Sequence, residues 1–355
     1  MQRLVNVYRG DHVESFHSGS IAVVEAGGRL LASAGDATLE TFLRSAAKPF
    51  QTIPLLQAGG ASYFDLTSEQ IALSCGSHGG EPFHVSTAAA ILRKGDFDES
   101  DLLCGVHHPY DEKALAELRI SGESASVLHN NCSGKHAGML LACQLMDVQT
   151  SDYVAAAHPL QLDVRRIISE FADLDAATIP MGIDGCGVPS FLMSLYRAAL
   201  AYARLVETSD APGSASALPD YTDSARLITE SMTGCAEYVG GRWTMTSPLM
   251  QAFNGELLAK EGAEGFYTMV FRGELADRVR EHLHAEDAGS IAVALKVHDG
   301  SMGRGRNPAI LRTLELLGVD RARLSSLESY RESTVRNVSG TLVGEVRAEF
   351  ELDIL

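Results

Sequence analysis

A serine and a lysine stand three residues apart at Ser45 and Lys48, a spacing that suits a serine nucleophile with an amine base. Residues three apart at the start of a helix share a face, so the hydroxyl and the amine can meet. Desolvation, or the charge of the neighbouring Arg44, would favour the neutral amine, which could then take the proton of Ser45. The pattern predicts acyl-transfer chemistry; the alternative is a capping serine beside a surface lysine.

Lysine is scarce in this chain, which has 29 basic residues but only six lysines. A desolvated lysine can give up its proton and act as a base or a ligand, whereas arginine in practice cannot. The lysines near other reactive groups are therefore of interest, and Lys94 and Lys113 are interpreted as ordinary surface residues. The other four are Lys48, Lys135, Lys260 and Lys296.

Two further strings crowd polar groups together. Ser77 and His78 precede two glycines, which allow close backbone approach to a ligand and can free amides for an oxyanion hole. The alternative there is a glycine-rich turn with a solvated histidine. Residues 129–138 precede an apolar helix, whose start could receive a carboxylate. Within them Cys132 and Lys135 could reach one metal ion if the lysine lost its proton, or could belong to an elaborate helix cap.

Two glycine-rich loops complete the set of candidate segments. Asp184 and Cys186 lie two apart among glycines, so both could point into one cavity, although a buried free cysteine is the alternative. Residues 260–265, which include Lys260, are expected to form a solvated charged turn between a helix and a strand. The remaining cysteines are expected to be buried free thiols: Cys75, Cys104, Cys143 and Cys235.

The spacing of apolar residues predicts strands at both ends of the chain and helices between them. Strands are expected within residues 1–35 and a large helical region over 45–258, and the C-terminal part, 265–355, is expected to contain strands and one helix. A segment near 207–220, rich in Ser, Ala, Pro and Gly, is expected to be a flexible loop. Individual elements are predicted at 13–17, 20–25, 30–33, 46–57, 85–94, 133–146, 160–171, 189–205, 266–271, 290–297, 307–317 and 341–350.

These elements predict an α/β (α+β) fold with one mixed, mainly antiparallel sheet built from both termini, in a single catalytic domain spanning 1–355. The arrangement resembles that of serine β-lactamases and penicillin-binding proteins. The net charge of −17 argues against a nucleic-acid partner or an anionic membrane surface. No run approaches the roughly 18 apolar residues of a membrane span, and no signal-peptide pattern begins the chain, so a cytoplasmic protein is expected.

Taken together, five strings resemble the Rhizobium-type L-asparaginase family, also called class 3 or asparaginase II. They are SAAKPFQ at 45–51, SHGGEPFH at 77–84, HNNCSGKHAGML at 129–140, GIDGCGVPSF at 182–191 and KEGAEG at 260–265. Five ordered matches are far more specific than any one of them. The resemblance implies a β-lactamase-like fold, a homodimer, and hydrolysis of L-asparagine to L-aspartate and ammonia.

The resemblance also implies roles for individual residues. Ser45 with Lys48 and Ser77 with Lys260 would be two serine–lysine pairs facing one substrate. A zinc ion would be bound by Cys132, Lys135 and Cys186, with a water oriented by Asp184 as fourth ligand, and would position substrate. Further substrate-binding residues are expected within the matching strings: Arg44, His78, Asn131, His136 and Asp184.

Other functions also fit parts of this pattern. A β-lactam hydrolase would normally carry Ser-Asp-Asn and Lys-Thr-Gly strings, and neither is present. A glutaminase, or another serine hydrolase of small amides, is harder to reject, since one methylene changes binding by only about 1–3 kcal/mol. A non-enzymatic alternative is a zinc-stabilised amino-acid-binding protein in which the serines are inert.

Overall fold

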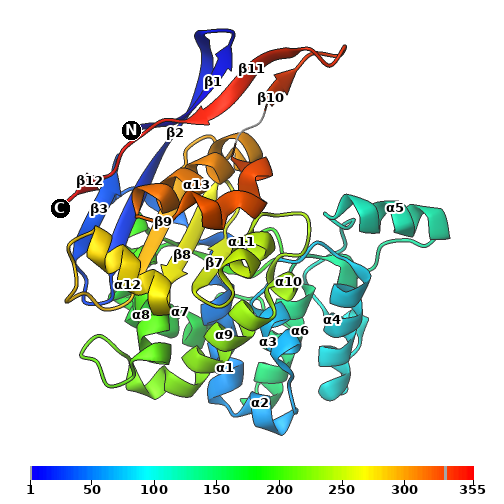
Figure 1. The fold of residues 1–355 in the computed structure, drawn as a ribbon. Helices are drawn as coiled ribbons and strands as arrows, with labels where there is room; N and C mark the ends of the chain where they lie inside the picture. The colour runs from blue at the N-terminus through cyan, green and yellow to red at the C-terminus, as the bar shows by residue number, and fades with distance from the viewer. Residues whose placement is uncertain (1, 332–333) are drawn as a thin grey trace.

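One antiparallel sheet, built from both ends of the chain, is the frame of the molecule (Figure 1). The computed structural model describes residues 2–331 and 334–355. The strand order is β10-β11-β1-β2-β9-β8-β7, with β3 beside β2 and β12 beside β3. The strands are β1 (Gln2–Arg9), β2 (His12–Glu25), β3 (Leu30–Ala34), β7 (Leu257–Glu261), β8 (Phe266–Phe271), β9 (Ile291–Val297), β10 (Thr334–Arg336), β11 (Leu342–Ala348) and β12 (Asp353–Ile354).

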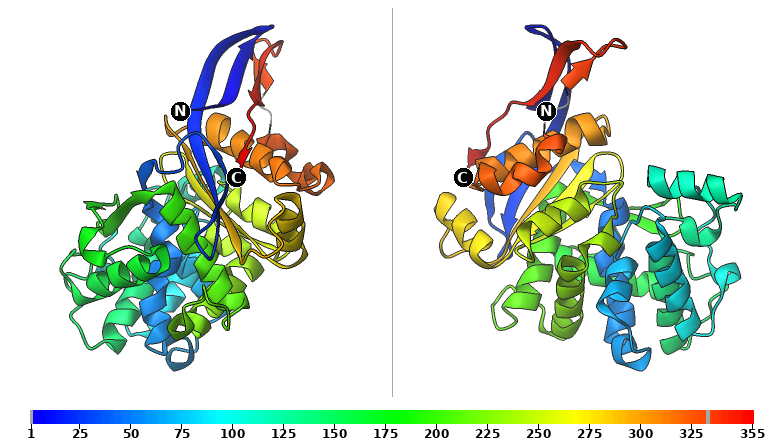
Figure 2. Two further views of the ribbon diagram at one scale, coloured as in Figure 1. Left: turned by 90° about the vertical axis from the view of Figure 1, so that its left-hand side faces the viewer. Right: turned by 45° about the vertical axis from the view of Figure 1, so that its right-hand side comes forward.

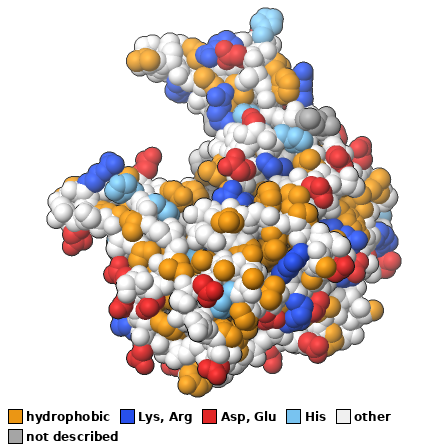
Figure 3. All heavy atoms as spheres, turned by 180° about the vertical axis from the view of Figure 1, so that it is seen from behind, with side chains coloured by type: hydrophobic (Ala, Val, Ile, Leu, Met, Phe, Trp, Pro, Cys, Tyr) orange, Lys and Arg blue, Asp and Glu red, His pale blue; other side chains and the backbone are white. Residues whose placement is uncertain are grey.

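The long strand β2 belongs to two parts of this sheet. Its second half is apolar and buried, and it pairs with β9 and β3, with Val23 opposite Val293 and Ala32. Its first half is mostly exposed and pairs with β1, which in turn pairs with β11. This half projects from the body as an arm (Figures 1 and 2), which also stands out in the space-filling view from behind (Figure 3). The predicted sheet from both termini is confirmed, and the strand pairs within its described residues are all antiparallel.

Helices cover both faces of the sheet (Figure 2). Helix α8 packs against β2, β8 and β9 on one face, and α12 and α13 lie on the other. None of the helices of the described residues is long and apolar enough to cross a membrane. The α-helices are α1 (Lys48–Gln57), α2 (Gly60–Tyr63), α3 (Ser68–Ser74), α4 (Pro82–Lys94), α5 (Glu112–Ser121), α6 (Ser133–Leu145), α7 (Pro159–Ala172), α8 (Leu195–Asp210), α9 (Thr222–Gly234), α10 (Ala236–Val239), α11 (Thr246–Phe253), α12 (Gly273–His282) and α13 (Asn307–Leu316).

A small second sheet and several short 3₁₀- and π-helical segments complete the chain. The small sheet has the order β4-β6-β5. Two clusters of buried apolar side chains form the interior, a large one around the main sheet and a smaller one among α3, α4 and α6. The remaining elements are β4 (Glu40–Phe42), β5 (Met181–Ile183), β6 (Pro189–Ser194), η1 (Arg44–Ala47), η2 (Glu99–Asp101), η3 (Val127–His129), η4 (Ala176–Thr178), η5 (Pro219–Tyr221), η6 (Met302–Arg306) and η7 (Arg321–Tyr330).

Several predicted elements differ from the structure. The strands expected at 13–17 and 20–25 form one strand, β2. The C-terminal part, expected to contain one helix, contains both α12 and α13. The helix expected over 189–205 is wrong in its first third, because residues 189–194 form β6 between β4 and β5. Ser194 then caps α8 by accepting a hydrogen bond from the Arg197 amide. The loop expected at 207–220 starts later, since α8 continues to Asp210. Helix was expected through residue 258, but α11 ends at Phe253 and β7 begins at Leu257.

Candidate active site

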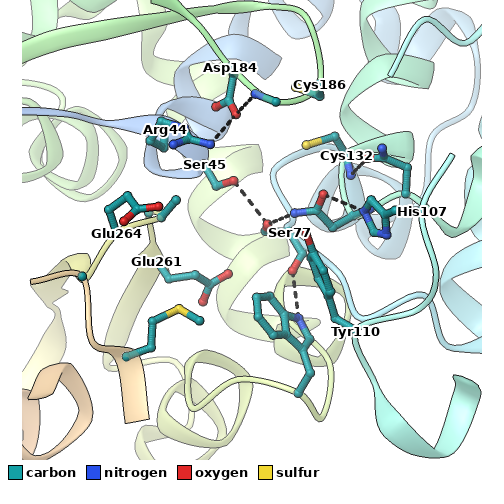
Figure 4. Close-up of a pocket in the computed structure, with 18 residues that line it drawn as sticks. Arg44, Ser45, Ser77, His107, Tyr110, Cys132, Asp184, Cys186, Glu261 and Glu264 are labelled. Carbon is teal, nitrogen blue, oxygen red and sulfur yellow. Dashed lines mark hydrogen bonds and ion pairs between the residues drawn. The ribbon is translucent and has the colours of Figure 1, made fainter. Parts of the chain in front are cut away.

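A cavity of about 470 Å³ opens where the loops between the two apolar clusters meet (Figure 4). Its walls come from segments far apart in the sequence. Five predicted site residues lie behind its walls and do not line it: Lys48, His78, Lys135, His136 and Lys260. The predicted site residues that line it are Arg44, Ser45, Ser77, Asn131, Cys132, Asp184 and Cys186.

The two predicted serines lie next to each other in the wall of this cavity. Ser45 lies in the tight turn η1, and Ser77 lies in the loop after α3, whose first turn is fixed by a capping box at Thr67. The Ser77 hydroxyl donates to Ser45 Oγ at 3.3 Å, and the Asn131 side-chain amide donates to Ser77 Oγ at 2.8 Å. Since Ser77 Oγ accepts from Asn131, its own proton is free to point at Ser45.

The loop of Ser77 uses its backbone amides for its own architecture. The Ser77 amide donates to Val239 O at 2.6 Å, and the His78 amide donates to Asn131 O. His78 is buried, contacts Ser133 Oγ through Nε2, and accepts the Gly80 amide at Nδ1. Burial lowers the pKa of His78 well below its ordinary value, so the ring is neutral. His78 thus ties the serine loop to the start of α6.

Two lysines are buried behind the serines. Lys48 Nζ donates to Gly76 O at 2.6 Å and to Asn131 O at 3.1 Å, so it joins the backbone of the Ser77 loop to that of Asn131. Lys260 was expected in a solvated turn, and that expectation is wrong: the residue is wholly buried in β7, paired with Thr268 of β8. Burial lowers the pKa of Lys260 to about 8, although Glu261 at 2.9 Å acts in the opposite direction.

Two cysteines and a lysine converge beside the serines. Lys135 Nζ lies 3.0 Å from Cys186 Sγ, and all three side chains of the Cys132, Lys135 and Cys186 set are buried. A hydrogen bond from the Cys186 thiol lowers the pKa of Cys132 well below its ordinary value, and the same bond raises the pKa of Cys186. Burial would lower the pKa of Lys135, but the charges of the two cysteines raise it overall. Among the described residues no group of three or more His, Cys, Asp or Glu side chains could hold a metal ion.

Of the remaining predicted binding residues, Arg44 and Asp184 line the cavity, whereas His136 does not. Arg44 donates to Asp184 Oδ1 at 3.0 Å, and both side chains line the cavity. Burial would raise the pKa of Asp184, but the hydrogen bond from Arg44 and the charge of Lys135 hold it below its ordinary value. His136 is buried against Tyr153, 2.7 Å from its hydroxyl, and burial lowers its pKa to about 4.

Comparison with protein families identifies the chain. The family model described as L-asparaginase II matches residues 5–348, nearly the whole sequence. The chain belongs to the L-asparaginase II family. This membership confirms the resemblance inferred from the five strings, and it supports an amidohydrolase activity. No curated protein is a significant match.

Solved structures give weaker similarities to this family member. A crystal structure of Mglu in its native form aligns with 14% identity and a TM-score of 0.42, over 84% of this chain and 63% of Mglu. The chain thus spans less than two thirds of the length of Mglu. A Bacillus subtilis probable glutaminase aligns with 13% identity and a TM-score of 0.37, over 79% of this chain and 80% of that protein.

Several residues of this family member's cavity were missed by the sequence analysis. His107, Tyr110 and Trp243 form an aromatic wall, with ring centroids 4.6 Å and 4.9 Å apart in that order. Trp243 also donates from Nε1 to Ser77 O at 3.2 Å. Glu261 and Glu264 line the opposite wall (Figure 4). Glu261 ends the strand β7, and the other four residues lie in loops, whose positions local sequence patterns do not indicate. The one available signal was that Trp243 is the only tryptophan in the sequence.

Proposed function

We propose that this protein is an L-asparaginase that hydrolyses the side-chain amide of L-asparagine to L-aspartate and ammonia through an acyl-enzyme. The observation that carries this proposal is the Ser77-to-Ser45 hydrogen bond inside a cavity that also contains a guanidinium and carboxylates. Family membership supports the reaction class. The choice of asparagine over glutamine belongs to the proposal.

Ser45 is the nucleophile in this mechanism. Its Oγ attacks the amide carbon of the substrate. The Ser77 hydroxyl, oriented by Asn131, donates a hydrogen bond to Ser45 Oγ. The C–N bond then breaks, ammonia leaves with a proton, and water hydrolyses the resulting ester. Each of these steps uses a proton that must be held nearby.

Lys48 is the proposed base for Ser45. A neutral amine has two hydrogens and one lone pair, and the two hydrogen bonds of Lys48 Nζ to carbonyl oxygens account for both hydrogens. The lone pair is then left to accept a proton. Burial lowers the pKa of Lys260, and the nearby positive charge of Lys48 lowers it further. Lys260 with Ser77 is proposed to relay protons.

The residues Cys132, Lys135 and Cys186 fit a zinc ion by the chemistry of their donors. Two sulfur atoms and one amine nitrogen converge, and thiolates are preferred zinc ligands. Binding would require Lys135 to release its proton. A bound zinc ion would supply a Lewis-acidic anchor that positions the substrate, and Asp184 lies in the same cavity. A homodimer and a serine β-lactamase-like fold are also part of this proposal.

Ammonia release from the purified protein tests the proposed function. We expect ammonia from L-asparagine, a fall of about 10⁴-fold or more for Ser45→Ala, and a fall of about 10²–10³-fold for Ser77→Ala. Ser325→Ala, an exposed serine of η7, is the matched control and should keep full activity. Faster release of ammonia from L-glutamine than from L-asparagine would make the protein a glutaminase. No release of ammonia from either amide would favour the alternative of a zinc-stabilised amino-acid-binding protein.

A further inference from the structure

Two charged residues of the cavity have an unusual backbone. Among the described residues, eight non-glycine residues have positive φ, and six of them are Asp, Asn or His, the types that tolerate this conformation best. The other two are Arg44, with φ +50°, and Glu264, with φ +57°. Both line the cavity. Such backbone costs energy and collects at functional sites, so these two side chains are held in place by the fold.

Arg44 has a hydrogen-bond donor that the protein does not use. One terminal guanidinium nitrogen donates to Asp184, and the other has no hydrogen bond within the described residues, although 31% of the side chain is exposed. This free terminal N–H can donate to a ligand carboxylate in the cavity. The guanidinium of Arg44 therefore suits the α-carboxylate of a substrate.

Glu264 is the complementary group. Three carboxylates line the cavity, and two of them are paired, Asp184 with Arg44 and Glu261 with Lys260. The carboxylate of Glu264 has no hydrogen bond or ion pair among the described residues, and it is at the solvent-exposed edge. The hydrogen bond with Asp184 is the main reason that the pKa of Arg44 is raised, and the nearby charge of Glu264 adds to this effect.

The fold fixes Glu264 from both sides. Its backbone carbonyl accepts a hydrogen bond from Lys296, whose Nζ also donates to Val297 O at 2.8 Å. The next residue is Gly265, with φ +73°, where an added Cβ would lie 2.9 Å from Val297 O. In Figure 4 the side chains of Arg44 and Glu264 lie on the same side of the serine pair, with Cys132 and His107 on the other side.

We propose that Arg44 and Glu264 form a clamp for the two charges of a free amino acid, with Arg44 on the α-carboxylate and Glu264 on the α-ammonium. This inference rests on the proposed function and adds its substrate class. The clamp leaves the side-chain amide of the substrate to extend toward Ser45 and Ser77. An amide whose α-nitrogen is absent or acylated, as inside a peptide, lacks the charge that Glu264 binds.

Comparison of two substrates tests the clamp. Succinamic acid is asparagine without the ammonium group. We expect the wild-type protein to favour L-asparagine in kcat/KM, and Glu264→Gln to lower that preference by about two- to fivefold, the ratio expected for an ion pair at an exposed site. The loss should fall on asparagine through KM and leave succinamic acid unchanged. Glu281→Gln, an exposed glutamate of α12, removes the same charge and should leave the preference unchanged.

Two results would overturn the clamp: an unchanged preference in Glu264→Gln, or an equal fall for both substrates. If the wild-type protein hydrolyses neither amide, the proposed function fails, and the clamp is then tested by calorimetry with L-aspartate and succinate. The clamp predicts tighter binding of L-aspartate and loss of that difference in Glu264→Gln. Equal binding of the two acids by the wild-type protein would refute it.

Discussion

Ser77 Oγ lies 3.3 Å from Ser45 Oγ, and the amide group of Asn131 lies 2.8 Å from Ser77 Oγ on its other side. Ser77 Oγ accepts from the Asn131 amide, which leaves its own hydroxyl hydrogen to donate to Ser45 Oγ. Ser45 Oγ receives this hydrogen bond, so negative charge that develops on Ser45 Oγ is stabilised.

The first prediction follows from this direction. Mass spectrometry of peptides from protein quenched during turnover should find the acyl group on Ser45. Ser77→Ala should still form the adduct, more slowly, because it removes a hydrogen bond and keeps the nucleophile. Asn131→Ala should lower kcat by about tenfold, since the Ser77 hydroxyl loses its orientation. An adduct on Ser77 would reverse the assigned roles.

The buried amine of Lys260 gives a prediction about pH. Burial lowers its pKa to about 8, so the amine is protonated below that pH and neutral above it. If the relay needs the neutral amine, kcat/KM should rise with pH and level off above about pH 8. Lys260→Arg should lose this rise, because arginine stays protonated.

Glu261 provides an internal check on that assignment. Its carboxylate lies 2.9 Å from Lys260 Nζ and opposes the lowering of the lysine pKa. Glu261→Gln removes this charge, so the inflection of the pH profile should move to lower pH. A profile that does not move, in a folded variant, would assign the inflection to another group.

The cysteine–lysine set predicts a metal requirement. We expect about one zinc ion per chain by elemental analysis, and Cys186→Ser should weaken zinc binding by more than about 100-fold. Cys235→Ser alters a free cysteine outside the cavity and serves as the control. Chelation should also weaken binding of L-aspartate in calorimetry. Unchanged affinity of the chelated protein would contradict substrate positioning by zinc.

The sheet could be predicted from the sequence because its strands depend on local patterns. Alternation in the first 35 residues and the apolar run of β9 directly reflect which faces are buried. The strand β7 was missed because all of its side chains are buried, including Lys260 and Glu261, so it has neither alternation nor an uninterrupted apolar run. The burial of these charges depends on partners elsewhere in the chain, Thr246 among them.

The candidate site was predictable only in part for the same reason. Short strings predicted Ser45, Ser77, Cys132 and Cys186, because each combines a reactive residue with glycines or a second reactive residue nearby in sequence. His107 and Trp243 come from unrelated loops and meet only after folding. The strain at Arg44 and Glu264 is a property of backbone angles, which no local composition at those positions announces.

The last prediction separates strain from charge at Glu264. A side chain at φ +57° costs about 1 kcal/mol relative to glycine, so Glu264→Gly should raise the free energy of unfolding by roughly that amount. The same variant should lose the preference for asparagine over succinamic acid, because the carboxylate is gone. Glu264→Ala removes the charge but keeps a Cβ, so it should lose the preference without the gain in stability. Denaturant unfolding of the three proteins measures this, and equal stability of the glycine and alanine variants would show that the backbone at this position is not strained.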